Sequence, residues 1–193
     1  MMGKRQLQKE QTRERIILAA RKVYSEYGFS APTADIANEA QISHGSIFTH
    51  FPTVENLLVS LLDSFSGDMN RELHVLVESG GNIEKLLSMH IDALIGHESF
   101  YRRLVMEAAC LPMEAKNTFI IIQSMVSIHF LQALEFEMSA GEIKDIPPHM
   151  FFNTWIGLIH HYLLNSELFA SQGSVLKEYK NDLIECFMTL IKK

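Results

Sequence analysis

The sequence predicts an all-α protein of nine helices in two parts, and three observations support this prediction. Apolar residues recur at spacings of three and four along nearly the whole chain, without an alternating strand pattern. Hydrophobic residues make up 47% of the 193 positions and charged residues 21%, which is typical of a folded globular chain. Glycine and proline interrupt the helical periodicity at a few places, and these breaks divide the chain into separate helices.

The first predicted helix ends at a glycine. Its apolar stripe, at spacings of three and four, consists of Ile16, Ala20, Val23, Tyr24 and Tyr27. Gly28 follows as the C-terminal stop, and Phe29 is placed to fold back on Tyr24, as at a glycine-capped helix end. The helix is therefore expected to end at Tyr27.

Three further helices are predicted in the first third of the chain, each opened by a hydroxyl side chain. Thr33, Ser43 and Thr53 are placed to cap them in that order, and Pro52 helps to stop the second of the three. Their inner faces are expected to be apolar: Ile36, Ala37 and Ala40; then Ile42, Ile47, Phe48 and Phe51; then Leu57, Leu58, Leu61, Leu62 and Phe65.

Five longer helices are predicted in the remainder of the chain. The breaks that separate them are Gly80–Gly81, the stretch from His97 to Ser99, Pro112, Gly141, Pro147–Pro148 and Gly173. The expected spans are 83–96, 100–109, 114–139, 148–169 and 175–191. These helices are richer in Met, Phe and Leu than the first four, which predicts a larger apolar core.

The charge is distributed unevenly along the chain. Residues 1–31 carry seven Lys and Arg and three Glu, a net charge of +4, within a chain whose formal net charge is -6. A basic end on an acidic body is typical of a protein that presents one face to phosphate. A solvated basic helix with no such partner has the same composition, so charge alone leaves both interpretations open.

The stretch from Thr33 to Phe51 has the layout of a helix-turn-helix. Two short capped helices are joined by a turn of about four residues. The second helix is expected to turn His44, Gly45, Ser46 and Thr49 outward. Gly45 weakens an exposed helix start by roughly 1 kcal/mol, and this cost is explained if a DNA backbone must approach closely. An ordinary helical hairpin fits the pattern about equally well.

The run from Arg15 to Leu58 resembles the tetracycline-repressor (TetR) family of transcriptional regulators. The matching residues are Ile17, Ala20, Gly28, Phe29, Thr33, Ile36, Ala37, Ala40, Ile42, Ser43, Gly45, Ile47, His50, Phe51, Glu55 and Leu57. The resemblance implies a DNA-binding domain over residues 1–54 and a ligand-binding and dimerisation domain over 55–193. It implies a cytoplasmic homodimer that binds a palindromic operator in double-stranded DNA and releases it when a small apolar or amphipathic effector binds.

The resemblance also implies roles for individual residues at the DNA. Thr33, Ser43 and His50 would contact phosphates, as would Arg13 in the basic arm. His44, Ser46 and Thr49 would face base edges, with Gly45 between them. Three positions depart from the family pattern: Gln41 replaces a glycine in the turn, Phe48 a tyrosine, and Val54 a lysine. The last two departures remove two backbone contacts.

The effector pocket is expected among the middle helices, because the resemblance places one there. The candidate residues are apolar or amphipathic on inward-reading faces: Met89, His90, Met106, Met125, His129, Trp155 and Ile159. Plain core packing explains each of them separately at least as well. The apolar faces of the last two helices are expected to form a dimer interface: Phe152, Trp155, Ile156, Ile159 and Leu163; then Leu176, Tyr179, Leu183, Phe187 and Leu190.

Other classes of protein find less support in the sequence. No histidine pair has the spacing of a zinc motif, and Cys110 and Cys186 are expected to be buried thiols. No phosphate loop, nucleophile elbow or dinucleotide turn is present, so neither an enzyme nor a cofactor is expected. No apolar run approaches the roughly 18 residues that a membrane span needs, so no span is expected. The alternative that stays open is a helical interaction protein, or an enzyme of unknown type, that has lost operator binding.

Overall fold

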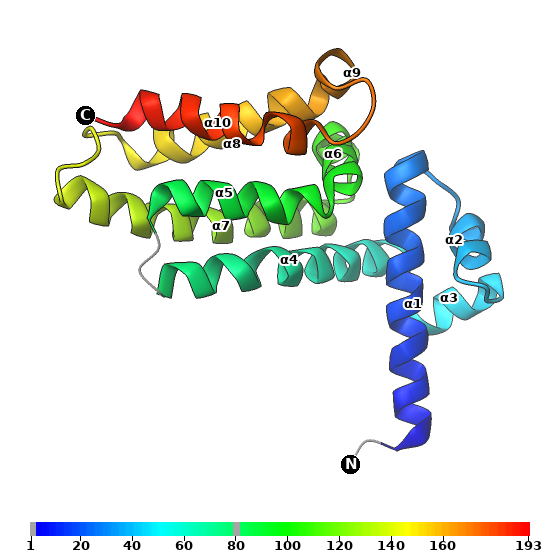
Figure 1. Cartoon of the computed structure of the whole chain (residues 1–193). Helices are drawn as coiled ribbons and strands as arrows, with labels where there is room; N and C mark the ends of the chain where they lie inside the picture. The colour runs from blue at the N-terminus through cyan, green and yellow to red at the C-terminus, as the bar shows by residue number, and fades with distance from the viewer. Residues whose placement is uncertain (1–2, 79–81) are drawn as a thin grey trace. The chain divides into compact units, whose positions relative to one another are not determined.

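The computed structural model describes residues 3–78 and 82–193, with side chains described for 3–70 and 82–193. These residues form ten α-helices and one 3-10 turn, and none of the described positions lies in a β-strand (Figure 1). The all-α prediction is confirmed. There is one helix more than expected, because the segment predicted over 148–169 divides at Asn165.

The chain forms two compact units. The first contains Met1–Phe65 and Ser99–Phe119, and the second contains Ser66–Glu98 and Ile120–Lys193. Residues 99–119 thus join the N-terminal helices, although the sequence analysis assigned them to the C-terminal domain. The predicted boundary between a DNA-binding domain (1–54) and a ligand-binding domain (55–193) concerns function and not compactness, and it stays a prediction.

The first unit is built from helices α1 (Lys4–Tyr27), α2 (Thr33–Glu39), α3 (His44–His50), the first half of α4 (Val54–Glu78), and α6 (Glu98–Glu107) with the turn Ala108–Cys110. Helices α2 and α3 lie together on one side of α1 (Figure 1). The core between these helices is apolar and fully buried: Ile16, Ala20, Tyr24, Ile36, Ile47, Leu57 and Phe65.

The predicted helix ends in this unit have mixed outcomes. Gly28 takes φ 83°, its N–H donates to the Tyr24 carbonyl at 3.0 Å, and the Phe29 ring lies 5.2 Å from the Tyr24 ring, all as predicted. Thr33 does not cap α2, because Pro32 occupies the N-cap position and Thr33 is the first helical residue. The Thr53 hydroxyl accepts from the Asn56 N–H at 3.1 Å, as a cap should.

Ser43 directly precedes α3, and Gln41 lies in the turn before it. Ser43 stands at the N-cap of α3, but its hydroxyl pairs with the Ser46 hydroxyl at 2.6 Å and makes no bond to a backbone N–H. Gln41 has φ 53°, the left-handed conformation that glycine adopts without strain. The residue that replaces the family's glycine in this turn therefore takes the conformation to which glycine is suited.

The second unit contains α5 (Ile83–Ile95), α8 (Pro148–Leu164), α9 (Ser166–Phe169) and α10 (Val175–Ile191), together with the second half of α4 and most of α7 (Met113–Ser139). Helices α5, α7, α8 and α10 lie alongside one another (Figure 1). Their bounds agree with the predicted spans to within two residues, apart from the division at Asn165. The predicted Gly80–Gly81 break lies outside the described residues.

Carboxylates close the N-termini of two helices in this unit. The Glu137 Oε1 atom accepts from the Ile83 N–H at 2.6 Å, at the start of α5. The Glu98 carboxylate accepts from the Val175 and Leu176 N–H groups at 2.9 and 3.3 Å, at the start of α10. These bonds satisfy donors that a helix leaves unpaired, and the negative charge suits the positive end of the helix dipole.

An aromatic cluster fills the centre of the second unit. The Trp155 ring lies 5.1 Å from the Phe187 ring, and Phe130 lies 6.3 Å from Phe151 and 5.4 Å from the His90 imidazole. The Trp155 indole N–H donates to His90 Nδ1 at 3.1 Å. Helices α5, α7, α8 and α10 therefore share one core.

This core uses the faces that were predicted to form a dimer interface. Seven of those ten residues are at most 7% exposed within the unit: Phe152, Trp155, Ile159, Leu163, Leu176, Leu183 and Phe187. The prediction that these faces form a dimer interface is therefore wrong for these seven residues, which the unit buries by itself. Exposed apolar side chains gather elsewhere, above all on α7: Ile120, Ile121, Met125, Ile128 and Phe136.

Helix α7 also corrects the expectation about membrane spans. Among the described residues, α7 is the one helix whose length and apolar composition would allow it to cross a membrane. The core helix of a soluble protein passes the same test, so a single such helix is weak evidence for a span.

Candidate nucleic-acid interface

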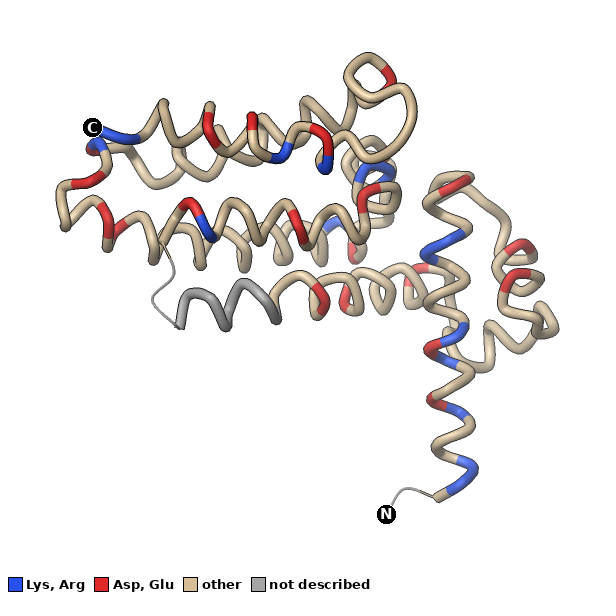
Figure 2. Tube along the Cα trace, in the orientation of Figure 1, with Lys and Arg blue, Asp and Glu red and all other residues tan. Residues whose placement is uncertain are grey.

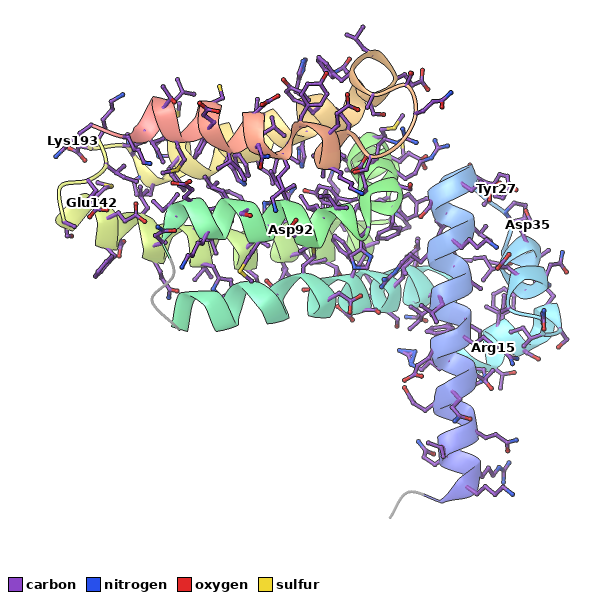
Figure 3. The ribbon with its side chains drawn as sticks, in the orientation of Figure 1. Arg15, Tyr27, Asp35, Asp92, Glu142 and Lys193 are labelled. Atoms are coloured by element: carbon purple, nitrogen blue, oxygen red, sulfur yellow. The ribbon has the colours of Figure 1, made fainter. Side chains whose placement is uncertain are left out.

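The basic residues of the first unit are concentrated on the first half of α1. Figure 2 shows this concentration, and the residues are Lys4, Arg5, Lys9, Arg13 and Arg15. Acidic residues lie near the other end of α1 and on α2, where Lys22 pairs with Glu39 at 2.8 Å. Figure 3 labels Asp35 on α2 and Arg15 on α1. A polyanion would therefore be attracted to the N-terminal half of α1 and repelled from its C-terminal end.

Helix α3 presents the residues that were predicted to face DNA. His44, Gly45 and Thr49 are exposed, and Ser46 is half-buried. A methyl group added at Gly45 would meet nothing within 4 Å in this structure, so glycine is not required there by the chain's own packing. The open space outside Gly45 fits the expectation that something external approaches the helix closely.

His44 is held by contacts within the unit. Its Nε2 atom lies 2.8 Å from the Thr33 hydroxyl oxygen, and its ring stands edge-on to Phe48 at a centroid distance of 5.4 Å. Phe48 is 39% exposed, so its predicted place on the inner face of α3 is wrong. The phenyl ring that replaces the family's tyrosine packs against the candidate base reader.

Two predicted phosphate contacts have partners inside the unit. The Arg13 guanidinium lies 4.5 Å above the Phe51 ring, and its Nη2 atom donates to the Ser60 hydroxyl at 2.9 Å. His50 Nδ1 is buried without a hydrogen-bond partner among the described residues. Burial, and then the positive charges of Lys9 and Arg13, lower the pKa of His50 below its usual value. Arg13 therefore ties the end of α3 to α1 and α4, whatever else it contacts.

Helix α6 clamps the C-terminal end of α1, a feature that the sequence analysis missed. Arg103 donates through Nη2 to the Glu26 carbonyl at 3.0 Å and through Nε to the Ser25 carbonyl at 3.4 Å. The Glu107 carboxylate accepts from the Phe29 N–H at 2.9 Å. Carbonyls at the end of a helix lack intrahelical partners, so a cation placed there satisfies them. The only sequence signal was the i, i+4 spacing of Arg103 and Glu107.

We expect Glu107→Ala to lower the free energy of unfolding of the first unit by about 1–2 kcal/mol, because the Phe29 N–H loses a charged acceptor. Glu107→Gln keeps an acceptor oxygen and should lose less. Thermal and urea unfolding followed by circular dichroism measure the difference. The exposed Glu14 on α1 provides the control, since Glu14→Ala removes a carboxylate that lies at the surface. Equal losses for the two alanine variants would contradict the clamp.

The predicted effector residues are divided by the structure. His90, Trp155 and Ile159 are buried in the second unit, and the first two are hydrogen-bonded to each other. Met89 and His129 are half-buried there, and Met125 is 41% exposed. Met106 lies in the first unit, on α6, and is 52% exposed. The structure therefore brings only part of the predicted set together.

A groove of about 470 Å³ lies between α5 and α10 in the second unit. Its lining is mixed in polarity and includes none of the predicted effector residues: Glu84, Ser88, Asn181, Ile184, Glu185, Met188, Thr189 and Lys192. Among the described residues, no group of three His, Cys, Asp or Glu side chains lies close enough together to hold a metal ion. Both cysteines are exposed, which corrects the expectation that they are buried thiols.

Comparison with known proteins supports the interpretation of the N-terminal helices. Residues 16–61 match the profile of the family described as bacterial regulatory proteins, tetR family. No curated protein matches the chain. The resemblance noted over Arg15–Leu58 is thus confirmed over nearly the same residues.

Solved structures match the chain over most of its length. A TetR-family transcriptional regulator from Agrobacterium tumefaciens has a TM-score of 0.79 at 16% identity and covers 96% of this chain and 100% of its own. The transcriptional regulator FadR from Bacillus subtilis, in complex with stearoyl-CoA, has a TM-score of 0.77 at 20% identity, over 91% and 97%. Reduced NemR from E. coli has a TM-score of 0.76 at 17% identity, over 94% and 98%.

Identities this low establish the fold, and the profile match establishes the kind of helix-turn-helix. Residues 16–61 therefore match the DNA-binding helices of the tetR family, and the chain has the fold of the TetR-family transcriptional regulators to which it is similar.

Proposed function

We propose that this protein is a homodimeric repressor that binds a palindromic operator in double-stranded DNA and releases it when a small apolar or amphipathic ligand binds. It acts in the cytoplasm as a regulator and not as an enzyme. The observation that carries the proposal is the face of α3, where His44, Gly45 and Thr49 are exposed on the unit that also carries the basic half of α1. No packing requirement accounts for a glycine there.

The residues divide into two groups at the DNA. His44, Ser46 and Thr49 face base edges in the major groove and select sequence, while Gly45 lets the backbone of α3 come close. Thr33, Ser43, His50 and Arg13 lie nearer the sugar–phosphate backbone and set affinity. Because Arg13 already donates to Ser60, its contact with phosphate uses its remaining N–H groups.

The ligand class is supported by the neighbours and by the composition of the second unit. The FadR structure from Bacillus subtilis holds stearoyl-CoA, a long apolar chain on a polar carrier. We therefore choose long-chain acyl thioesters as the first compounds to test. Met89, His90, Met125, His129, Trp155 and Ile159 would line the site in the second unit, and Met106, which lies in the first unit, is left out of it. Since His90, Trp155 and Ile159 are at most 2% exposed, a ligand reaches them only if neighbouring side chains move.

Dimerisation is proposed through exposed residues of the last helices, of which Leu190 was expected from the sequence and the other two were not. Leu164, Leu168 and Leu190 are 48%, 79% and 57% exposed on α8, α9 and α10. Two copies joined in this way present two α3 helices to successive major grooves. DNA fixes their separation at about 34 Å, so a small tilt of α4 caused by ligand would cost contacts in one half-site. A coupling of about 1–3 kcal/mol between ligand and operator is typical of such linkage.

The experiment begins with selection of a binding site from a pool of random double-stranded DNA by the purified full-length protein. We expect a palindromic site, a dimer by light scattering at micromolar concentration, and weaker binding in stearoyl-CoA than in coenzyme A alone. Thr49→Ala should change base preference, and Arg13→Ala should weaken all duplexes alike with a shallower salt dependence. Failure to select any sequence would favour the alternative of a helical interaction protein or an enzyme that has lost operator binding.

A further inference from the structure

A polar pair joins the two helices of the helix-turn-helix. Thr33 is the first residue of α2 and His44 the first of α3, and the Thr33 hydroxyl oxygen lies 2.8 Å from His44 Nε2. Phe48, one turn further along α3, stands at 87° to the imidazole with ring centroids 5.4 Å apart. The imidazole is therefore held at two places, although His44 and Phe48 are both exposed.

The Thr33 hydroxyl is available for this contact because it does not cap its helix. Pro32 occupies the N-cap position of α2, and no side chain there bonds to the first turn. Threonine is half-buried at this point, which restricts the directions that its hydroxyl can take. The bond to His44 is thus the one hydrogen bond that the Thr33 hydroxyl makes to the described residues.

The bond to Thr33 occupies Nε2 of His44, so only the other ring nitrogen, Nδ1, remains for a hydrogen bond to a partner. In a neutral imidazole one ring nitrogen carries a hydrogen and the other accepts. If the Thr33 hydroxyl donates to Nε2, the other nitrogen, Nδ1, carries the hydrogen and is a donor. If Nε2 donates to Thr33, Nδ1 is an acceptor. Nδ1 makes no hydrogen bond to the part of the chain whose side chains are described.

Base edges distinguish a donor from an acceptor. Guanine offers two acceptors in the major groove, N7 and O6, whereas the amino groups of adenine and cytosine donate there. An imidazole that is free to rotate and to exchange its hydrogen reads either kind of edge. An imidazole whose Nε2 is bound to Thr33 has only Nδ1 left for a base, and the ring points Nδ1 in one direction.

We propose that Thr33 is a positioning residue for sequence reading: it fixes the orientation of the His44 imidazole, through which one operator base is selected. This rests on the proposed DNA-binding function and refines it. A residue that contacted only phosphate would change affinity for all sequences alike, whereas a positioning residue changes preference at the base that His44 reads.

The test measures binding of single-base variants of the selected site to four proteins: Thr33→Val, Thr33→Ser, His44→Ala and the double variant Thr33→Val/His44→Ala. Thr33→Val keeps the shape and removes the hydroxyl, while Thr33→Ser keeps the hydroxyl. We expect Thr33→Val and His44→Ala to lose about fivefold of discrimination at the same base position. Thr33→Ser should retain it, and the double variant should lose no more than His44→Ala.

A second measurement needs no DNA. Imidazole ¹⁵N chemical shifts report which ring nitrogen carries the hydrogen, and the His44 signal is the one missing from His44→Ala. Thr33→Val should shift that signal, and Thr33→Ser should not. Matching thermal melts of the Thr33 variants exclude a general loss of folding.

Three results would overturn the inference. In the first, Thr33→Val weakens binding to all duplexes equally. In the second, the effect of Thr33→Val adds fully to that of His44→Ala in the double variant. In the third, the ¹⁵N signal of His44 is the same in Thr33→Val as in the wild type. A wild-type protein that selects no sequence at all would instead overturn the proposed function itself. The two failures are therefore distinguishable.

Discussion

Phe187→Ala should lower the free energy of unfolding by about 3–5 kcal/mol, the usual loss for a buried phenylalanine. Phe187 is 1% exposed, and its ring lies 5.3 Å from Phe151 and 5.1 Å from Trp155. Alanine leaves a cavity in the core that α8 and α10 share with their neighbours. Urea unfolding of the full-length protein, followed by tryptophan fluorescence and circular dichroism, measures the loss.

Cys186 provides the matched control on the same helix. It is exposed and adjacent to Phe187 in the sequence, so Cys186→Ala should change stability by at most about 0.5 kcal/mol. The oligomeric state separates the two interpretations of this helix. If Phe187→Ala keeps its stability but becomes a monomer, Phe187 belongs to an interface between subunits after all.

The sequence predicted the N-terminal helices well because their signals are local. The end of α1 depends on Gly28 and on Phe29, which folds back on Tyr24, and all three lie within six residues of one another. Gln41 was likewise singled out from one position, as the residue that replaces a glycine in the turn, and it has a left-handed φ of 53°. Helix caps were predicted less well, because a hydroxyl at a helix start can bond to another side chain, as Thr33 does to His44.

The sequence could not divide the apolar faces of the last helices between core and interface. Periodicity identifies an apolar face but says nothing about the face it meets. The ring partners of Phe187 lie on α8, those of Trp155 lie on α5 and α10, and His90 lies 65 residues from Trp155 along the chain. The same limit applied to Arg103 and Glu107, whose partners lie 77 and 78 residues away.

The pairing of His90 with Trp155 has a consequence for stability at low pH. Burial, and then the positive charge of His160, lower the pKa of His90 to about 3, and burial lowers that of His160 to about 4. In the unfolded chain a histidine titrates near pH 6.5. Between these values the unfolded state binds more protons than the folded state, so the free energy of unfolding falls as the pH falls.

We expect His90 alone to account for roughly 2–3 kcal/mol of lost stability between about pH 6.5 and 4.5, at about 1.4 kcal/mol per pH unit. His90→Asn tests this, because its amide oxygen can accept from the Trp155 indole N–H and does not titrate. The variant should have a shallower dependence of the free energy of unfolding on pH in this range, measured by urea unfolding at several pH values. His149, which is exposed at the start of α8, provides the control, since His149→Asn should leave the slope unchanged. Parallel pH profiles for the wild type and His90→Asn would mean that the His90 imidazole becomes protonated without unfolding the second unit, and that the Trp155 bond does not hold it neutral.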